Sequence, residues 1–155
     1  MRKPIPGSDN RTLLVCRLLN RRRARYLLTG GIAANLHGSV RATKNVDLLI
    51  PKDVANAERV LSALGELPLG IGRELDASQV IARPFTIVGD MPRVDLLTVA
   101  CTVTFEQAWP NRLVRRIGGV SVPYLALADL IRSKQTGRAS DLADIEVLSA
   151  LKPRN

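Results

Sequence analysis

Two short apolar runs, separated by glycines and a stretch of small residues, organise the first third of the sequence. The run at 26–28 is short enough for a buried strand, and the run at 46–50 predicts a second strand with Asp47 near its start. Between them, Gly30 and Gly31 open a small-residue segment with helical character. Glycines let a backbone approach a phosphate closely, and the first N–H groups of a helix favour an anion. This order of elements predicts a compact site for phosphate and metal.

The rest of the apolar pattern alternates between helical and strand periods, with turn signals in between. It predicts helices over 10–23, 53–64, 104–109, 125–135 and 139–151, strands over 85–88 and 93–99, a hairpin of 112–117 and 120–122, and a loop over 65–77. A chain of 155 residues can build one domain with a real core. We therefore expect a single α/β (α+β) domain over 1–155, with residues 1–8 as a flexible tail.

Apolar stripes also indicate which helix faces point inward. The positions expected to face the core are Leu14, Val15, Leu18 and Leu19 in the first helix, Leu127, Leu130 and Ile131 in the next-to-last helix, and Leu142, Ile145 and Leu148 in the last. Lys134 continues the stripe of its helix, which is an unusual place for a charge. Asp141 and Asp144 flank the apolar face of the last helix at helical spacing.

The composition shows a large excess of basic over acidic residues. The chain has 23 Lys and Arg against 14 Asp and Glu, a formal net charge of +9, which attracts polyanions such as nucleic acid and nucleotide phosphates. The run from Arg21 to Arg25 is read either as a solvated helix end or as a phosphate-contacting patch. Since only five residues are aromatic, a base-stacking platform is not expected, and RNA would bind through its phosphates.

Other features bear on compartment and cofactors. No apolar run approaches the roughly 20 residues of a membrane span, and the basic N-terminus lacks the apolar region of a secretory signal. Cys16 and Cys101 are far apart in apolar surroundings, which favours two buried thiols in a reducing cytoplasm over a disulfide. The single His37 excludes an all-histidine zinc site, and we read it as a structural histidine at the end of the first small-residue helix.

Two carboxylates stand early in apolar strands: Asp47 in NVDLLI and Asp95 in RVDLLTV. Burying an unpaired carboxylate is costly. One solution is a cation between them, for which oxygen ligands and Mg²⁺ fit metal-assisted phosphoryl or nucleotidyl transfer. The other is that each aspartate pairs with an arginine, such as Arg93 or Arg41. Residue chemistry alone leaves both open.

Three separated segments resemble one family. Gly30-Gly31, His37-Gly38, Arg41, Thr43 and Asn45-Val46-Asp47 come first, Asp95 follows on a later strand, and Lys134, Gly137-Arg138, Asp141 and Asp144 close the pattern. Together they resemble the nucleotidyltransferase-fold superfamily, in particular small bacterial nucleotidyltransferases of abortive-infection and toxin–antitoxin systems. The resemblance covers about residues 24–148.

The resemblance implies a nucleotidyltransferase fold, with a mixed β-sheet flanked by helices and a C-terminal helix pair. It implies Mg²⁺ held at Asn45, Asp47 and Asp95, and a nucleoside triphosphate substrate bound by Gly30, Gly31, Arg41, Thr43 and Lys134. Asp47, Asp95, Lys134 and Asp144 would be the catalytic set, with Asp144 rather than Asp141 orienting the triphosphate or the acceptor. Such enzymes transfer a nucleotide to tRNA or other RNA, or to a protein, with release of pyrophosphate, and some act beside an antitoxin protein.

The sequence departs from the family pattern at Asn45, where the first aspartate of Asp-x-Asp is expected. An amide oxygen can ligate Mg²⁺, but it adds no negative charge and cannot act as a base. The chain is therefore either a weakened Mg²⁺-dependent nucleotidyltransferase or a catalytically inactive nucleotide- or RNA-binding module of the same fold. A third hypothesis, an aminoglycoside-type small-molecule modifier, fits the basic charge poorly because a cationic substrate requires an acidic pocket.

Overall fold

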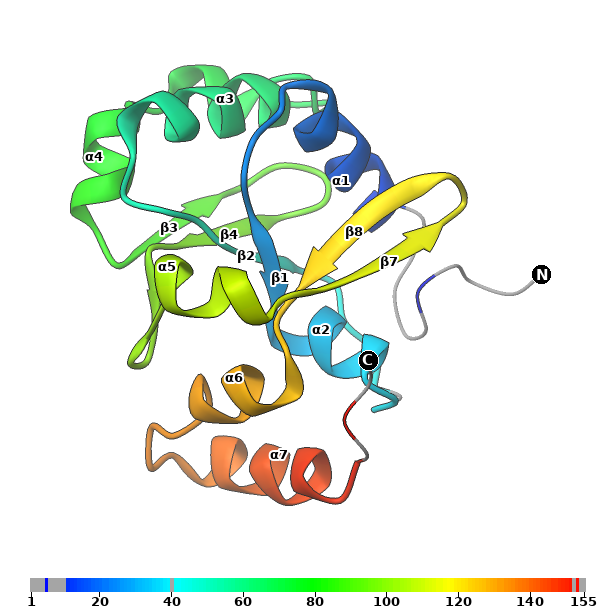
Figure 1. Ribbon diagram of the computed structural model, residues 1–155. Coiled ribbons are helices and arrows are strands. Elements are labelled where there is room, and N and C mark those ends of the chain that lie inside the picture. Colours follow the sequence, from blue (N-terminus) through cyan, green and yellow to red (C-terminus); the bar gives the residue numbers. More distant parts are fainter. Residues whose placement is uncertain (1–4, 6–10, 40, 152, 154–155) are drawn as a thin grey trace.

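The computed structural model describes residues 5, 11–39, 41–151 and 153, and its centre is a mixed six-stranded sheet (Figure 1). The strand order is β3-β4-β2-β1-β8-β7. The strands β2 and β4 run parallel, as do β1 and β8, while the pairs β1–β2, β3–β4 and β7–β8 are antiparallel. The predicted mixed sheet with flanking helices is confirmed.

The strands are short, with two to five residues each. They are β1 (Leu27–Thr29), β2 (Val46–Leu49), β3 (Phe85–Val88), β4 (Val94–Leu97), β7 (Leu113–Ile117) and β8 (Val120–Tyr124), with a separate small pair of β5 (Val99–Ala100) and β6 (Val103–Thr104). Apolar side chains on the central strands are fully buried, including Leu28, Leu48 and Leu96. Because β1 and β2 lie inside the sheet, their near-continuous apolar sequences are what burial on both faces requires.

Helices cover the sheet and one of its ends. They are α1 (Arg11–Arg21), α2 (Gly30–Leu36), α3 (Val54–Leu64), α4 (Ala77–Ala82), α5 (Phe105–Ala108), α6 (Leu127–Arg132) and α7 (Ala139–Ser149), with 3₁₀ turns η1 (Ile71–Glu74) and η2 (Trp109–Asn111). In the view of Figure 1, α3 and α4 lie above the sheet, whereas α6 and α7 stack together below it, next to α2. The predicted C-terminal helix pair is thus present. Within the described residues, no helix has the length and apolar character needed to cross a bilayer.

Several element boundaries differ from the predictions. The segment predicted as a loop contains η1 and leads into α4, whose first turn is capped by Asp76 accepting a hydrogen bond from the Ser78 N–H at 2.8 Å. The helix predicted at 125–135 ends at Arg132, so Lys134 follows the helix rather than lying on its stripe. The predicted tail lies outside the described residues, except for Ile5, which is buried.

Three predicted core positions are wrong. Leu142 is 53% exposed and Leu14 is also exposed, because α7 and α1 turn other faces inward. Cys16 is buried as predicted, but Cys101 is exposed. Cys101 sits in the tight turn between β5 and β6 with a positive φ of 58°, and this turn projects the thiol out of the apolar surroundings that its neighbours suggest.

Candidate functional site

The parallel pairing of β2 and β4 places the two strand carboxylates side by side. Asp47 lies opposite Asp95 in the register of this pair, and Thr29 of β1 lies opposite Asp47 on the other side. Side chains directly opposite each other share one face of a sheet. The two carboxylates and Thr29 therefore form one row, which lines a pocket of about 290 Å³ that we call the carboxylate pocket.

The two carboxylates have different surroundings. Arg93 donates from Nε to Asp95 Oδ1 at 2.8 Å and from Nη2 to Oδ2 at 3.1 Å, so Asp95 is held by a two-point ion pair. Among the described residues, no cation lies within ion-pairing distance of Asp47. Burial, and then the charge of Asp95, raise the pKa of Asp47 to about 6, although Lys134 and Arg93 partly oppose the shift. Arg93 thus compensates Asp95, as the arginine-pairing alternative expected, whereas Asp47 has no arginine partner among the described residues.

Gly30 and Gly31 allow the start of α2 to pack closely against Asp47 and Thr43. Gly30 begins α2 with φ of 65°, and a Cβ there would lie 2.0 Å from Asp47 Oδ2. Any larger residue would have to displace that carboxylate and adopt a strained backbone. A Cβ at Gly31 would lie 3.1 Å from Thr43 Oγ1. The glycine pair therefore allows the start of α2 to contact both the carboxylate row and the segment that leads into β2.

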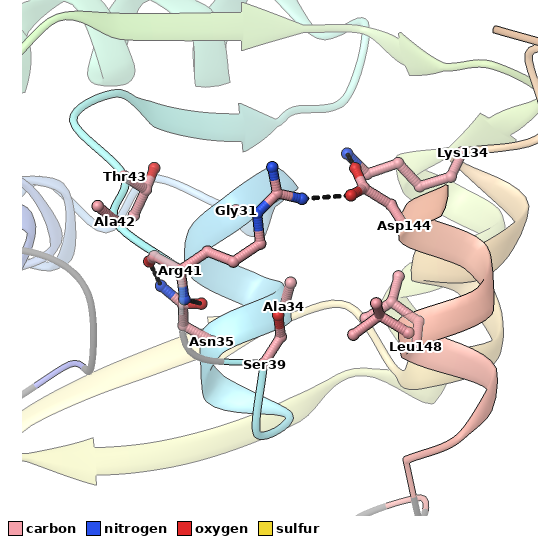
Figure 2. A pocket seen from close by; sticks show the side chains of 11 residues that line it. Gly31, Ala34, Asn35, Ser39, Arg41, Ala42, Thr43, Lys134, Asp144 and Leu148 are labelled. Atoms are coloured by element: carbon pink, nitrogen blue, oxygen red, sulfur yellow. Dashed lines mark hydrogen bonds and ion pairs between the residues drawn. The ribbon is translucent and has the colours of Figure 1, made fainter. Parts of the chain in front are cut away.

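A second pocket has a volume of about 220 Å³, and Figure 2 shows the side chains that line it. We call it the Arg41 pocket; its lining includes Gly31, Arg41, Thr43, Lys134 and Asp144. Asp144 of α7 accepts hydrogen bonds from Arg41 and, at 3.1 Å, from Lys134 Nζ, so it bridges two cations from distant segments. Lys134 lines both pockets, which makes it the residue that joins them.

Buried Asn35 of α2 positions Arg41. Its side-chain amide donates to the Arg41 carbonyl at 2.7 Å and its amide oxygen accepts from the Arg41 N–H at 3.1 Å. The segment that follows α2 is thereby tied to the helix, and the Arg41 side chain extends from a fixed backbone toward Asp144 (Figure 2). The sequence analysis missed Asn35; its position two residues before His37-Gly38 gives no periodic signal.

Asp141 forms the far wall of the carboxylate pocket. It is buried, accepts a hydrogen bond from Thr136 Oγ1, and pairs with Arg138 Nε at 2.7 Å. The Thr136 hydroxyl, followed by Arg138, holds the pKa of Asp141 below its usual range, although burial acts in the opposite direction. Asp141 therefore secures the turn between α6 and α7, on which Lys134 sits, whereas Asp144 faces the Arg41 pocket.

Asn45, predicted as a metal ligand, and His37, predicted as a structural residue, both lie outside the two pockets. Asn45 is half-buried just before β2, its carbonyl accepts a hydrogen bond from Thr43 Oγ1 at 3.4 Å, and it lines neither pocket. Buried His37 donates from Nε2 to the Leu125 carbonyl at 2.7 Å and packs edge-on against Tyr124. His37 thus ties the end of α2 to the segment after β8, which agrees with a structural role, although its contact is distant in sequence rather than at the Gly38 turn.

The carboxylate pocket also contains a residue that the sequence analysis overlooked. Phe85 of the edge strand β3 lies opposite Leu97 of β4, lines the pocket and is 45% exposed. An exposed aromatic ring beside paired carboxylates offers a flat face to a planar ligand. The alternation of β3 could have placed Phe85 on a face, but not next to Asp95.

The donor set suits one divalent cation rather than a closed protein cage. Asp47 and Asp95 are adjacent, and of the two only Asp95 has an ion-pair partner among the described residues. Within the described residues, no group of three or more His, Cys, Asp or Glu could hold a metal ion. Mg²⁺ is commonly held by one or two carboxylates together with waters and substrate phosphates, and the two aspartates fit that mode.

Comparisons with known proteins support the fold. No protein-family model matches the sequence, and no curated protein matches it. The structure is similar to a crystal structure of an antigenic nucleotidyltransferase-like protein from Paracoccidioides brasiliensis, with a TM-score of 0.53 and 20% sequence identity, over 90% of this chain and 73% of that one. At this identity the similarity establishes the fold: the chain has a nucleotidyltransferase-like fold, as the sequence resemblance implied.

Proposed function

We propose that the protein binds a nucleoside triphosphate, with Mg²⁺, across the carboxylate pocket and the Arg41 pocket, and transfers a nucleotide to an acceptor hydroxyl. One observation carries the proposal: Asp47 and Asp95 meet in register at a pocket that Lys134 joins to a second, cation-lined pocket. A compact carboxylate pair beside two cations matches a ligand that carries both a divalent ion and phosphates.

Each residue has a physical role in this proposal. Asp47 and Asp95 would hold Mg²⁺, which would neutralise phosphate charge and activate the acceptor oxygen when bound. Arg93 fixes the Asp95 carboxylate through its two hydrogen bonds. Lys134 and Arg41 would exchange part of their pairing with Asp144 for phosphate oxygens, and Arg41 is exposed enough to turn. Asp144 would then orient the released cations.

The reaction would join the acceptor oxygen to the α-phosphorus of the triphosphate. The bond from that phosphorus to the bridging oxygen would break, pyrophosphate would leave, and the hydroxyl proton would pass to water. The start of α2, with its two glycines, allows the backbone to come close to the carboxylate row. Gly30, Gly31 and Thr43 would therefore face the phosphates, while the exposed Phe85 ring would receive a base.

The acceptor in this proposal is RNA or a protein, as in toxin-type nucleotidyltransferases that act in the cytoplasm beside an antitoxin. The resemblance of Gly30-Gly31, Asp47, Asp95 and the Lys134 segment to that branch supports it, and the net charge of +9 favours an RNA acceptor over a cationic small molecule.

A second candidate is a nucleotide- or RNA-binding relative without transfer activity. Two observations favour it: Asn45 lines neither pocket, and Asp95 is already paired with Arg93. In that case one charge of the carboxylate pair is satisfied by protein, and the pocket would hold a nucleotide without the second metal that two-metal transfer uses.

Transfer from an α-labelled triphosphate to total RNA, with and without Mg²⁺, separates the two candidates. The matched set is wild type, Asn45→Asp, Asp95→Ala and the surface control Glu146→Gln, an exposed position on α7. The nucleotidyltransferase proposal expects Mg²⁺-dependent label transfer that Asn45→Asp increases and Asp95→Ala abolishes. Nucleotide binding without transfer in both wild type and Asn45→Asp supports the binding module, and absence of nucleotide binding in every variant rejects both.

A further inference from the structure

A basic groove lies away from the two site pockets, between α1 and the β7–β8 hairpin, which are neighbours in Figure 1. It consists of two pockets, of about 410 and 220 Å³. Asn20 and Ser121 line both, and Asn20 Nδ2 donates to the Ser121 carbonyl at 2.8 Å. The two pockets therefore lie on either side of this contact, and we call them together the α1–hairpin groove.

The charge of the groove is of one sign. Arg17 and Arg21 line its first half, and Arg112 lines its second half. Among the described residues that line it there is no carboxylate, whereas the carboxylate pocket and the Arg41 pocket both contain aspartates. Arg17 and Arg21 are exposed and form no ion pair with a described residue. The neighbouring Arg22 and Arg25, by contrast, pair with Glu66 and Asp53 at 3.2 Å.

The arginines of the groove have defined positions at its two ends. Arg17 and Arg21 are four residues apart on α1, so they extend from one face about 6 Å apart along the helix axis. Arg112 is fixed at the other end, because its Nη1 donates to the Trp109 carbonyl at 2.9 Å and its guanidinium lies 3.7 Å from the centre of the Trp109 ring. Phe105 stacks on the same ring, so Trp109, which is half-buried and lines the second pocket, is already packed against an arginine and an aromatic ring.

The groove lies at the edge of the sheet and takes its lining from both faces of β8. Tyr124 lies opposite Leu28 in the parallel pair β1–β8. Strand alternation therefore turns Val120 to the Leu28 face, and Ser121 and Pro123 to the face that carries Thr29. The groove is thus separate from the carboxylate row, which lies on β2 and β4.

We propose that the α1–hairpin groove binds the sugar–phosphate backbone of RNA. The described lining residues include three arginines and no acid, and Arg17 and Arg21 form no ion pair with a described residue. Because the Trp109 ring in the groove is already packed against Arg112 and Phe105, these cations fit repeated phosphates better than bases. This inference deepens the proposed function by locating the surface that would hold an RNA acceptor. It also stands if the protein only binds RNA, because the groove shares no lining residue with the two site pockets.

The test is fluorescence anisotropy with a labelled single-stranded RNA of about 16 nucleotides, in EDTA and without any triphosphate, so that catalysis and metal binding play no part. The test variant is Arg17→Glu with Arg21→Glu. The control is Arg59→Glu with Arg83→Glu, which makes the same charge change at exposed arginines outside the groove. Thermal unfolding verifies that both fold, and Arg17→Gln with Arg21→Gln repeats the test without charge reversal.

The groove variant is expected to bind RNA at least about tenfold more weakly than the control, since two charge-assisted contacts to phosphates are lost. The slope of log Kd against log salt between about 50 and 200 mM KCl should fall by about 1.4 for two lost phosphate contacts. Equal weakening in test and control variants, or wild-type affinity in the groove variant, overturns the inference. So does a polyglutamate peptide that binds the groove as tightly as the RNA, because the surface would then fit an acidic protein.

Discussion

Replacing Asp47 with asparagine is expected to stabilise the fold while removing the proposed metal site. Asp47 lies in register with Asp95 and has no ion-pair partner among the described residues. Asparagine has nearly the same shape, carries no charge, and can donate a hydrogen bond to the Asp95 carboxylate. The substitution therefore removes a repulsion between two carboxylates and leaves the packing in place.

The magnitude follows from the pKa of Asp47, which rises from 3.8 to about 6 because of burial and the neighbouring Asp95. An acid with a raised pKa in the folded protein binds protons more tightly there than in the unfolded chain, so it costs stability as the pH rises. Below pH 3.8 the side chain is neutral in both states and costs nothing. Above about pH 6 the cost is complete, and a shift of about two units corresponds to about 3 kcal/mol.

The assay is urea unfolding of wild type and Asp47→Asn, without divalent cations, at several values between pH 4 and 8. The difference in unfolding free energy should be near zero at the acid end and grow to about 3 kcal/mol above pH 6. Glu146→Gln, which removes one exposed charge from α7, should show no such growth. If Asp47→Asn is less stable than wild type at pH 7, or if the difference does not depend on pH, the ionised Asp47 carboxylate does not destabilise the fold as reasoned above.

Three further predictions concern the same site. Gly30→Ala should destabilise the fold by about 1–2 kcal/mol of backbone strain and also displace Asp47, whose Oδ2 would lie 2.0 Å from the new Cβ; Gly89→Ala, which meets nothing within 4 Å, is the matched control, and equal melting temperatures would contradict the account. Asp141→Asn should destabilise the protein at pH 7 by about 1.5–3 kcal/mol, because a charged hydrogen bond is lost. Since the pKa of Asp141 is lowered in the fold, this loss of stability should vanish as the pH falls through the folded-state pKa. A loss of stability that stays constant with pH in urea unfolding would argue against the ion pair. Phe85→Ala should raise the Kd for a triphosphate by about fivefold to tenfold if the ring stacks on a base. Leu69→Ala, at an exposed position that lines neither site pocket, should leave the Kd unchanged; calorimetry measures both.

Apolar patterning predicted the central architecture well, because burial on both faces leaves little freedom. The runs around Leu28, Leu48 and Leu96 became inner strands of the sheet, and the glycine pair introduced α2. The same reasoning missed α4, which is too short for a periodic signal. Its Asp76 cap, which accepts from the Ser78 N–H, was the local clue that could have revealed it.

Long-range contacts determine the two features that the apolar pattern did not predict, the inward face of α7 and the pairing of Asp47 with Asp95. Helix α7 turns Asp141 and Asp144 inward rather than Leu142, since Arg138, Lys134 and Arg41 compensate those carboxylates. Arg138 is the N-cap of α7, while Lys134 and Arg41 lie farther away in the sequence, so helical periodicity alone favoured the apolar face. The register of Asp47 with Asp95 likewise depends on pairing between strands 48 residues apart, which local sequence does not encode.

The most direct test of the central claim is isothermal titration calorimetry of wild type, Lys134→Gln and Asp47→Ala with each nucleoside triphosphate in the presence of Mg²⁺. Lys134 joins the two pockets, and Asp47 supplies half of the carboxylate pair. If a triphosphate spans both pockets, wild type binds at least one of the four with a Kd that each substitution raises by about tenfold or more, and omission of Mg²⁺ weakens wild type but not Asp47→Ala. Absence of binding to wild type, or equal affinity in all three proteins, would contradict the account.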